Sequence, residues 1–136
     1  MCSSDLVHLQ AVGSRESIKA RLLGMDAPEI CQAFGADSKA ALSRRINQMM
    51  VTVESLRQDD YGRALAIIYL NGEEINAWMV QQGFAWSYGA RGSKGPYKRD
   101  EEQARQMRRG LFANHQAMKP SQFRRKNKAC PAHASA

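Results

Sequence analysis

The stretch RLLGMDAPE, residues 21–29, says more about the architecture than any other part of this sequence. A mainly apolar segment, typical of a strand, runs into it and stops at Gly24. Pro28 has no backbone N–H and disfavours a helical conformation of the residue before it, so the chain is expected to continue as a loop. This order of strand and turn brings Asp26 and Glu29 close together.

Short apolar segments on both sides of this stretch predict further strands. They lie at residues 7–12, 18–23, 51–56, 63–70 and 84–88. Asn71-Gly72 is the strongest hairpin signal in the chain. Helical spacing of apolar residues predicts three helices, at residues 36–49, between Gly72 and Gly83, and at 97–109. This order indicates the α+β class and a five-stranded β-barrel of OB type with three helices, whose first strand is expected upstream of residue 7.

The composition fits one globular domain. The chain has 136 residues, of which 43% are hydrophobic and 24% are charged. It contains no run of 18 apolar residues, so no membrane span is expected. The net charge is +7, and residues 103–136 contain Lys and Arg but no Asp or Glu. Such a segment attracts nucleic acid or an anionic membrane surface, or is simply a solvated end. Beyond Lys119 no periodicity is visible, so residues 119–136 are expected to form a basic, disordered tail.

The three cysteines are Cys2, Cys31 and Cys130. None belongs to a CxxC pair, so a zinc site is not expected. A disulfide between Cys31 and Cys130 would suit an oxidising compartment, and two separate thiols fit the sequence equally well.

The charged residues near the turns suit phosphodiester chemistry. Two carboxylates in one turn repel each other unless a cation or a proton lies between them, and Ca²⁺ accepts carboxylate and carbonyl oxygens. Arg21 offers a planar guanidinium for a phosphate, and Arg63 follows the turn at 59–62 and is expected to reach the same cleft. Taken singly, each motif also fits a polar turn with a surface ion pair. Together they fit stabilisation of charge on a phosphorus centre and activation of a water molecule.

Four stretches in this order resemble the thermonuclease family, also called staphylococcal-nuclease-like nucleases. They are RLLGMDAPE (21–29), DDYGRALAIIY (59–69), NGEEINAWMVQQGFAW (71–86) and EEQARQMRRGLF (101–112). The resemblance covers roughly residues 7–125. It implies an OB-fold barrel with three helices and a Ca²⁺-dependent endonuclease that hydrolyses DNA and RNA and leaves 3′-phosphate ends.

The resemblance also implies roles for individual residues. Arg21 resembles the arginine that contacts the phosphate, Arg63 resembles the second phosphate arginine, and Glu29 resembles the residue that orients or activates the water. The remaining residues are the Ca²⁺ ligands Asp26 and the Ala27 carbonyl, and the nucleotide-binding aromatic Tyr88. A noncatalytic OB-fold module that only binds nucleic acid is the alternative. The joint presence of both arginines and Glu29 favours the enzyme, because a binding module does not need this set.

The start of the chain departs from the family pattern. Residues 1–6 back-translate to the end of a widely used sequencing adapter, so we expect a non-native start followed by a domain over residues 7–118. The family usually has Asp-Gly-Asp-Thr at this point, and Asp5 falls in register with its second calcium-binding aspartate. We expect a monomer, exported if the natural N-terminus carries a signal. Asp60 is a second departure, since some members have a basic residue there.

Overall fold

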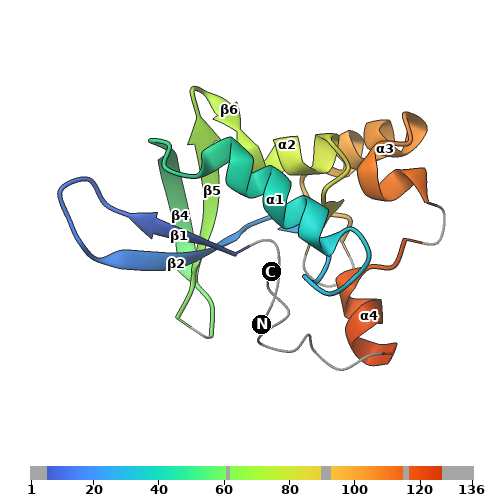
Figure 1. The fold of residues 1–136 in the computed structure, drawn as a ribbon, viewed down its shortest axis with the longest axis horizontal. Helices are drawn as coiled ribbons and strands as arrows, with labels where there is room; N and C mark the ends of the chain where they lie inside the picture. Colours follow the sequence, from blue (N-terminus) through green and yellow to red (C-terminus); the bar gives the residue numbers. More distant parts are fainter. Residues whose placement is uncertain (1–5, 61, 90–92, 115–116, 127–136) are drawn as a thin grey trace.

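A computed structural model describes residues 6–60, 62–89, 93–114 and 117–126. It has a mixed sheet on one side and most of its helices on the other (Figure 1). The strands are β1 Leu6–Gln10, β2 Ser17–Leu22, β3 Met25–Asp26, β4 Thr52–Gln58, β5 Ala64–Leu70, β6 Glu73–Glu74 and β7 Trp86–Ser87. The helices are α1 Gly35–Ile46, α2 Ile75–Gln81, α3 Lys98–Gln106, the 3₁₀ helix η2 Gly110–Ala113 and α4 Pro120–Lys126.

The main sheet has the order β1-β2-β5-β4, with β6 folding back on β5. Strands β2 and β5 are parallel, while the other neighbours are antiparallel. Asn71 and Gly72 have φ angles of 50° and 82°, which confirms the predicted hairpin turn. Among the described residues β1 and β4 do not pair, so the expected closed barrel is not found there and the sheet is open. The strand expected upstream of residue 7 lies outside the described part of the chain, apart from Leu6, which belongs to β1.

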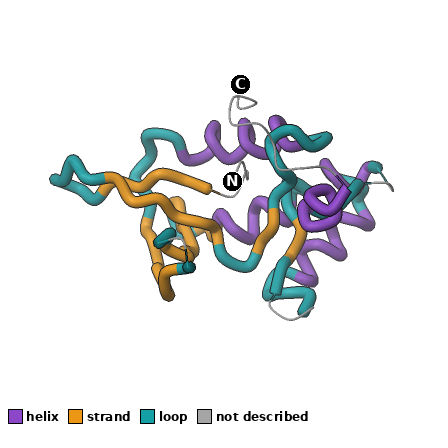
Figure 2. The backbone as a smooth tube through the Cα atoms, turned by 90° about the horizontal axis from the view of Figure 1, so that it is seen from below, coloured by secondary structure: helices purple, strands orange, loops and turns teal. Residues whose placement is uncertain are grey.

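The main core lies where α1 and α2 cover the sheet (Figure 2). Helix α2 packs against β5 and α3 and buries Ile75 and Met79 completely, as its helical spacing predicts. The other large buried side chains of this core are Leu22, Met25, Leu42, Ile68, Leu70, Val80 and Tyr97. A smaller cluster contains Trp86, Ala104, Leu111 and Phe112.

Residues 25–29 do not form only a loop. Met25 and Asp26 pair with Ser87 and Trp86 as the antiparallel strands β3 and β7. The prediction of a loop is therefore wrong for its first two residues, because a strand distant in sequence satisfies their backbone hydrogen bonds. This pairing fixes the backbone at Asp26 instead of leaving it in a turn.

Two helices are shorter than their predicted ranges. Helix α1 begins at Gly35 and ends at Ile46, three residues before its predicted end, and the Ser38 hydroxyl donates to the Phe84 carbonyl at 2.8 Å. Helix α3 ends at Gln106 and not at residue 109, with Arg108 in the left-handed region at φ 52°. A Cβ on Gly110 would lie 2.4 Å from the carbonyl oxygen of Gly83. This glycine therefore serves a close backbone contact.

The expected tail contains a further helix. Residues 120–126 form α4, so the prediction of disorder from residue 119 onward is wrong for this segment. Pro120 suits the first position of a helix and is fully buried, which anchors α4 on the domain. Residues 127–136 lie outside the described part of the chain. None of the described helices is long and apolar enough to cross a membrane.

Candidate active site

Buried Asn76 holds the turn that presents the candidate site. Its amide Nδ2 donates to the carbonyls of Leu23 and Ala66 at 2.8 and 3.0 Å, and its Oδ1 accepts from the Ile68 N–H at 3.1 Å. The side chain therefore joins the end of β2 to the middle of β5 from the first turn of α2. Three residues after Leu23 the chain reaches Asp26, which is 9% exposed. Sequence reasoning missed Asn76, since a helical Asn carries no sign of its contacts.

The pairing of β3 with β7 brings Tyr88 to Arg21. The Tyr88 N–H donates to the Gly24 carbonyl at 2.9 Å, which continues the ladder between the two strands. The Arg21 guanidinium carbon lies 5.9 Å from the centre of the Tyr88 ring, within the range of a cation–π contact. Tyr88 is half exposed, so one face of this pair is open to a ligand.

Arg63 is held in place by Asp59. The Arg63 N–H donates to Asp59 Oδ1 at 2.9 Å, and its Nε donates to Oδ2 at 2.7 Å. Both side chains are largely buried, so this ion pair is less screened than a surface pair. The sequence marked Asp59 only as part of a turn and gave no sign that it would orient the arginine.

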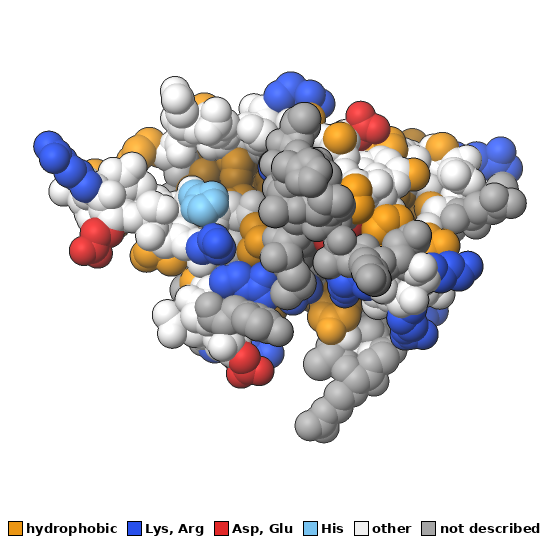
Figure 3. Space-filling model, turned by 60° about the horizontal axis from the view of Figure 1, so that its bottom comes forward, with side chains coloured by type: hydrophobic (Ala, Val, Ile, Leu, Met, Phe, Trp, Pro, Cys, Tyr) orange, Lys and Arg blue, Asp and Glu red, His pale blue; other side chains and the backbone are white. Residues whose placement is uncertain are grey.

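The two arginines lie on the same face of the sheet. Arg21 pairs in register with Leu65, two residues after Arg63, and side chains alternate between the faces of a sheet. The strand spacings place their Cα atoms about 8 Å apart. Figure 3 shows Lys and Arg side chains gathered in the middle of one face of the molecule, with most of the visible acidic side chains toward its margins. The site is therefore suited to a ligand with negative charge.

Glu29 is almost completely buried, with 2% of its surface exposed. Its backbone N–H donates to Gln32 Oε1 at 3.0 Å, and its carbonyl accepts from the Gln32 N–H at 2.9 Å. The carboxylate forms an ion pair with Arg124 of α4. The start of α1 lies directly behind it, because a Cβ on Gly35 would come within 1.9 Å of the Glu29 carbonyl oxygen. The loop is thus fixed on both sides.

Cys31 follows Glu29 by two residues and is disulfide-bonded. The structure therefore rules out a free thiol at Cys31, while Cys130, its predicted partner, lies outside the described residues. The other two cysteines of the chain lie outside the described residues.

Two of the predicted calcium ligands lie among the described residues. Asp26 and the carbonyl of Ala27 are hard oxygen donors of the kind that Ca²⁺ binds, so their chemistry fits this ion. Among the described residues no group of three His, Cys, Asp or Glu side chains comes together to form a metal site. Asp5, the other predicted ligand, lies outside the described part of the chain.

Tyr97 and Ser87 close the far side of the β3–β7 pair. The Tyr97 N–H donates to the Ser87 hydroxyl at 2.9 Å, and the Ser87 N–H donates to Glu101 Oε1 at 2.9 Å. The Tyr97 hydroxyl donates to the Glu74 carboxylate. Burial and this carboxylate raise the pKa of Tyr97 well above its ordinary value, so the phenol stays protonated at neutral pH.

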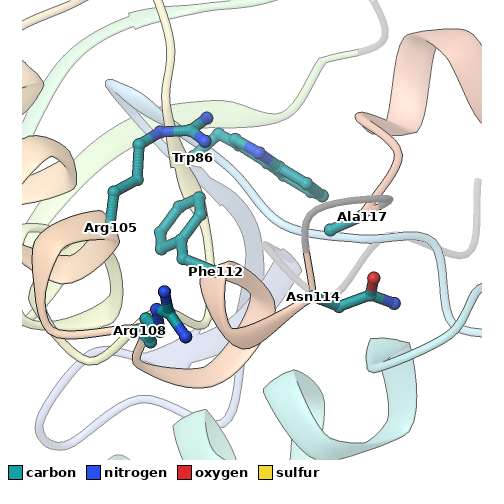
Figure 4. A pocket seen from close by; sticks show the side chains of 6 residues that line it. All are labelled: Trp86, Arg105, Arg108, Phe112, Asn114 and Ala117. Atoms are coloured by element: carbon teal, nitrogen blue, oxygen red, sulfur yellow. The ribbon is translucent and has the colours of Figure 1, made fainter.

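A pocket of about 290 Å³ adjoins this strand pair (Figure 4). It is lined by Trp86, Arg105, Arg108, Phe112, Asn114 and Ala117. Arg105 donates to Glu101 at 3.0 Å, and its guanidinium carbon lies 4.6 Å from the centre of the Phe112 ring. Because Trp86 pairs with Asp26, the pocket places two more cationic side chains beside the candidate site.

Comparison with known proteins places this arrangement in a family. Residues 19–114 match the model of staphylococcal nuclease homologues. A protein of Haemophilus influenzae described as an uncharacterized endonuclease is 41% identical over 113 residues, which are 83% of this chain and 64% of that protein. A micrococcal nuclease of Shigella flexneri is 35% identical over 126 residues, 85% of this chain and 72% of the relative. A staphylococcal-like nuclease of Arabidopsis thaliana is 33% identical over 113 residues, but these are only 35% of its length.

The chain belongs to the staphylococcal nuclease family, whose domain is an OB-fold. This confirms the resemblance and the α+β fold class that the sequence indicated. The chain spans less than two thirds of the Haemophilus relative and about a third of the Arabidopsis protein. The motifs at 21–29 and 59–63, far apart in the sequence, come together at the site because β2 pairs with β5.

Proposed function

We propose that this protein is a calcium-dependent endonuclease that hydrolyses phosphodiester bonds of DNA and RNA with little sequence specificity and leaves 3′-phosphate ends. The observation that carries the proposal is the placement of Arg21 and Arg63 on one face of the sheet, with Arg63 fixed by Asp59. Two arginines on one face of the sheet, with Cα atoms about 8 Å apart, suit a phosphate whose negative charge increases during the reaction. Membership of a family with relatives named as nucleases supports the same function.

The proposed reaction is the attack of water on phosphorus. Glu29 orients the water and accepts its proton, and the water oxygen bonds to phosphorus as the bond to the 5′ oxygen breaks. The leaving oxygen takes a proton from solvent, which gives a 3′-phosphate and a 5′-hydroxyl. Arg21 and Arg63 stabilise the charge on the phosphoryl oxygens. Tyr88, held against Arg21, offers an aromatic surface to a neighbouring base.

Asp26, the Ala27 carbonyl and Asp5 are the residues proposed to bind Ca²⁺. When bound, the ion would polarise the phosphate and neutralise part of its charge. The exposed part of the Tyr88–Arg21 pair and the two pocket arginines would then extend the contact to neighbouring nucleotides. This extension fits a single-stranded or opened substrate, whose bases are free to stack.

The test is cleavage of heat-denatured DNA and of RNA with Ca²⁺ and with excess chelator. We expect cleavage only with Ca²⁺, and products whose 5′-hydroxyl ends accept a label directly from a polynucleotide kinase. Arg63→Ala and Glu29→Ala should each lower turnover by roughly a thousandfold, since each removes one group that acts in the transition state. Arg15→Ala, in the exposed turn between β1 and β2, removes the same charge away from the site and should leave turnover unchanged.

Three results would contradict the proposal. Cleavage that persists in chelator would exclude the calcium dependence, and unlabelled 5′ ends would exclude the proposed bond. Salt-dependent binding of DNA without any cleavage would instead identify a noncatalytic OB-fold module, the alternative that the sequence left open.

A further inference from the structure

Helix α4 reaches the candidate catalytic carboxylate. Arg124 Nη1 donates to Glu29 Oε1 from a side chain that is 38% exposed, whereas Glu29 is 2% exposed. A buried, charged carboxylate that lacks a partner lowers the stability of the folded protein by several kcal/mol. The group that pairs with such a carboxylate therefore allows it to remain charged in the interior. In the described part of the chain, Arg124 is the side chain that pairs with Glu29.

The contact is supported by a second link between the same two segments. Gln32 accepts from the Glu29 N–H with its Oε1 and donates to the Met118 carbonyl with its Nε2. Pro120, two residues after Met118, is fully buried and anchors the first turn of α4. Arg124 is one helical turn further along, so its position follows from this anchor. Figure 1 shows α4 beneath the loop that leads into α1.

Polar contacts are important here because the apolar packing under α4 is incomplete. A cavity of about 310 Å³ separates the helix from the loop before α1 and from η2. Its lining includes Phe34, Leu111, Met118 and Phe123. Side chains that line this pocket make fewer apolar contacts on that side than fully packed side chains do, so the polar contacts contribute to holding the helix. The Gln32 and Arg124 contacts therefore determine how α4 sits against the Glu29 loop.

The geometry also leaves one oxygen of Glu29 for chemistry. Arg124 binds Oε1, and no side chain or backbone group among the described residues donates to Oε2. A carboxylate held by one oxygen keeps its orientation while the other oxygen can accept a proton from water. Glu29 thus has the arrangement of a general base with a fixed orientation.

We propose that Arg124 is a positioning residue for Glu29, and that α4 is in this way part of the active site and not a solvated tail. The inference rests on the proposed nuclease function, because it assigns Arg124 a role through the water-activating carboxylate. Arg124 contacts neither the reacting phosphate nor the metal in this scheme. Its effect should therefore fall on turnover and not on substrate affinity.

The test compares Arg124→Gln with Arg125→Gln in the full chain. Both changes remove one positive charge from the same helix, but Arg125 is exposed and forms no ion pair with the described residues. We expect Arg124→Gln to lower kcat about 30-fold with KM within twofold, by analogy with the cost of losing a hydrogen bond to a charged group. Arg125→Gln should leave kcat unchanged, and Arg124→Lys should restore part of the loss.

A double-mutant cycle separates positioning from a general charge effect. In the Glu29→Gln background, Arg124→Gln should lower the residual rate by less than twofold, because its target is already gone. A readout independent of activity is the rate of tryptic cleavage after Arg125 in folded protein. Glu29→Gln should raise this rate severalfold and Asp37→Asn, an exposed control, should not.

The outcomes distinguish this inference from the proposed function. A wild-type protein without Ca²⁺-dependent cleavage overturns both. Active wild type with equal kcat in Arg124→Gln and Arg125→Gln overturns the positioning role alone. A higher kcat in Arg124→Gln also overturns it, because α4 would then restrain the carboxylate from reacting.

Discussion

Replacing Asn76 with Leu tests how the turn before Asp26 is held. The two side chains have the same number of heavy atoms and branch at the same carbon, so the change leaves no large cavity. It removes the donor to the partly buried Leu23 carbonyl and the acceptor of the buried Ile68 N–H. The Ala66 carbonyl keeps a partner, because it also accepts from the Leu23 N–H at 2.9 Å. Two groups are therefore left without a hydrogen bond.

The expected loss of stability follows from these two groups. Each buried backbone group without a partner costs about 1–3 kcal/mol, so the free energy of unfolding should fall by about 4 kcal/mol. For a domain of this size that is a large part of a total of about 5–15 kcal/mol. With a urea m-value of about 2 kcal/mol/M, the unfolding midpoint should drop by about 2 M.

The assay is equilibrium urea unfolding followed by tryptophan fluorescence and by far-UV circular dichroism. Coincident curves and an unchanged m-value are required before midpoints are compared. Asn47→Leu, at the exposed end of α1, is the matched control and should move the midpoint by less than about 0.3 M. A shift under about 0.5 M for Asn76→Leu would refute the reasoning, because the two backbone groups would then have found other partners.

Three further predictions concern groups around the site. Asp59→Asn keeps an acceptor for the Arg63 N–H but loses the charge that holds the Arg63 guanidinium, so kcat should fall about tenfold. Asp60→Asn, at the exposed neighbouring residue, is the control and should leave kcat unchanged. Equal kcat values for the two variants in steady-state assays would contradict this prediction. Gly35→Ala places a Cβ 1.9 Å from the Glu29 carbonyl oxygen. Calorimetry should show that the free energy of unfolding falls by about 3 kcal/mol, despite the better helix propensity of Ala. The control Ala36→Ser should lower it by less than about 0.5 kcal/mol. Tyr97→Phe removes a phenol whose pKa is raised in the folded state by burial and by Glu74. In the wild type this phenol contributes its full stabilisation below the ordinary pKa of 10.0, and the contribution is lost as the pH rises above that value. The stability difference between wild type and Tyr97→Phe should therefore shrink between about pH 9 and about pH 11 in urea unfolding, and a constant difference would show that the phenol does not titrate with unfolding.

The local patterns in the sequence were sufficient for strands β1, β2, β4 and β5, for the hairpin at Asn71-Gly72 and for α2. Each of these depends on interactions within a few residues, such as alternation, turn geometry and helical spacing. The segment at 25–29 was harder to predict, because its first two residues are a strand only through pairing with β7. Helix α4 gave no periodic signal, since it is short and its anchor, Pro120, is a single buried residue.

The sequence by itself determined the family, the α+β class and the residue types that phosphodiester chemistry needs, because these are carried by short motifs in a fixed order. Only the tertiary structure showed which groups hold those residues: Asn76 behind the turn, Asp59 on Arg63, and Arg124 on Glu29. Two of these partners are 53 and 95 residues away along the chain from the groups they bind. The physical reason is that a buried polar group can be satisfied by any segment that the fold brings to it, and a local pattern carries no information about that segment.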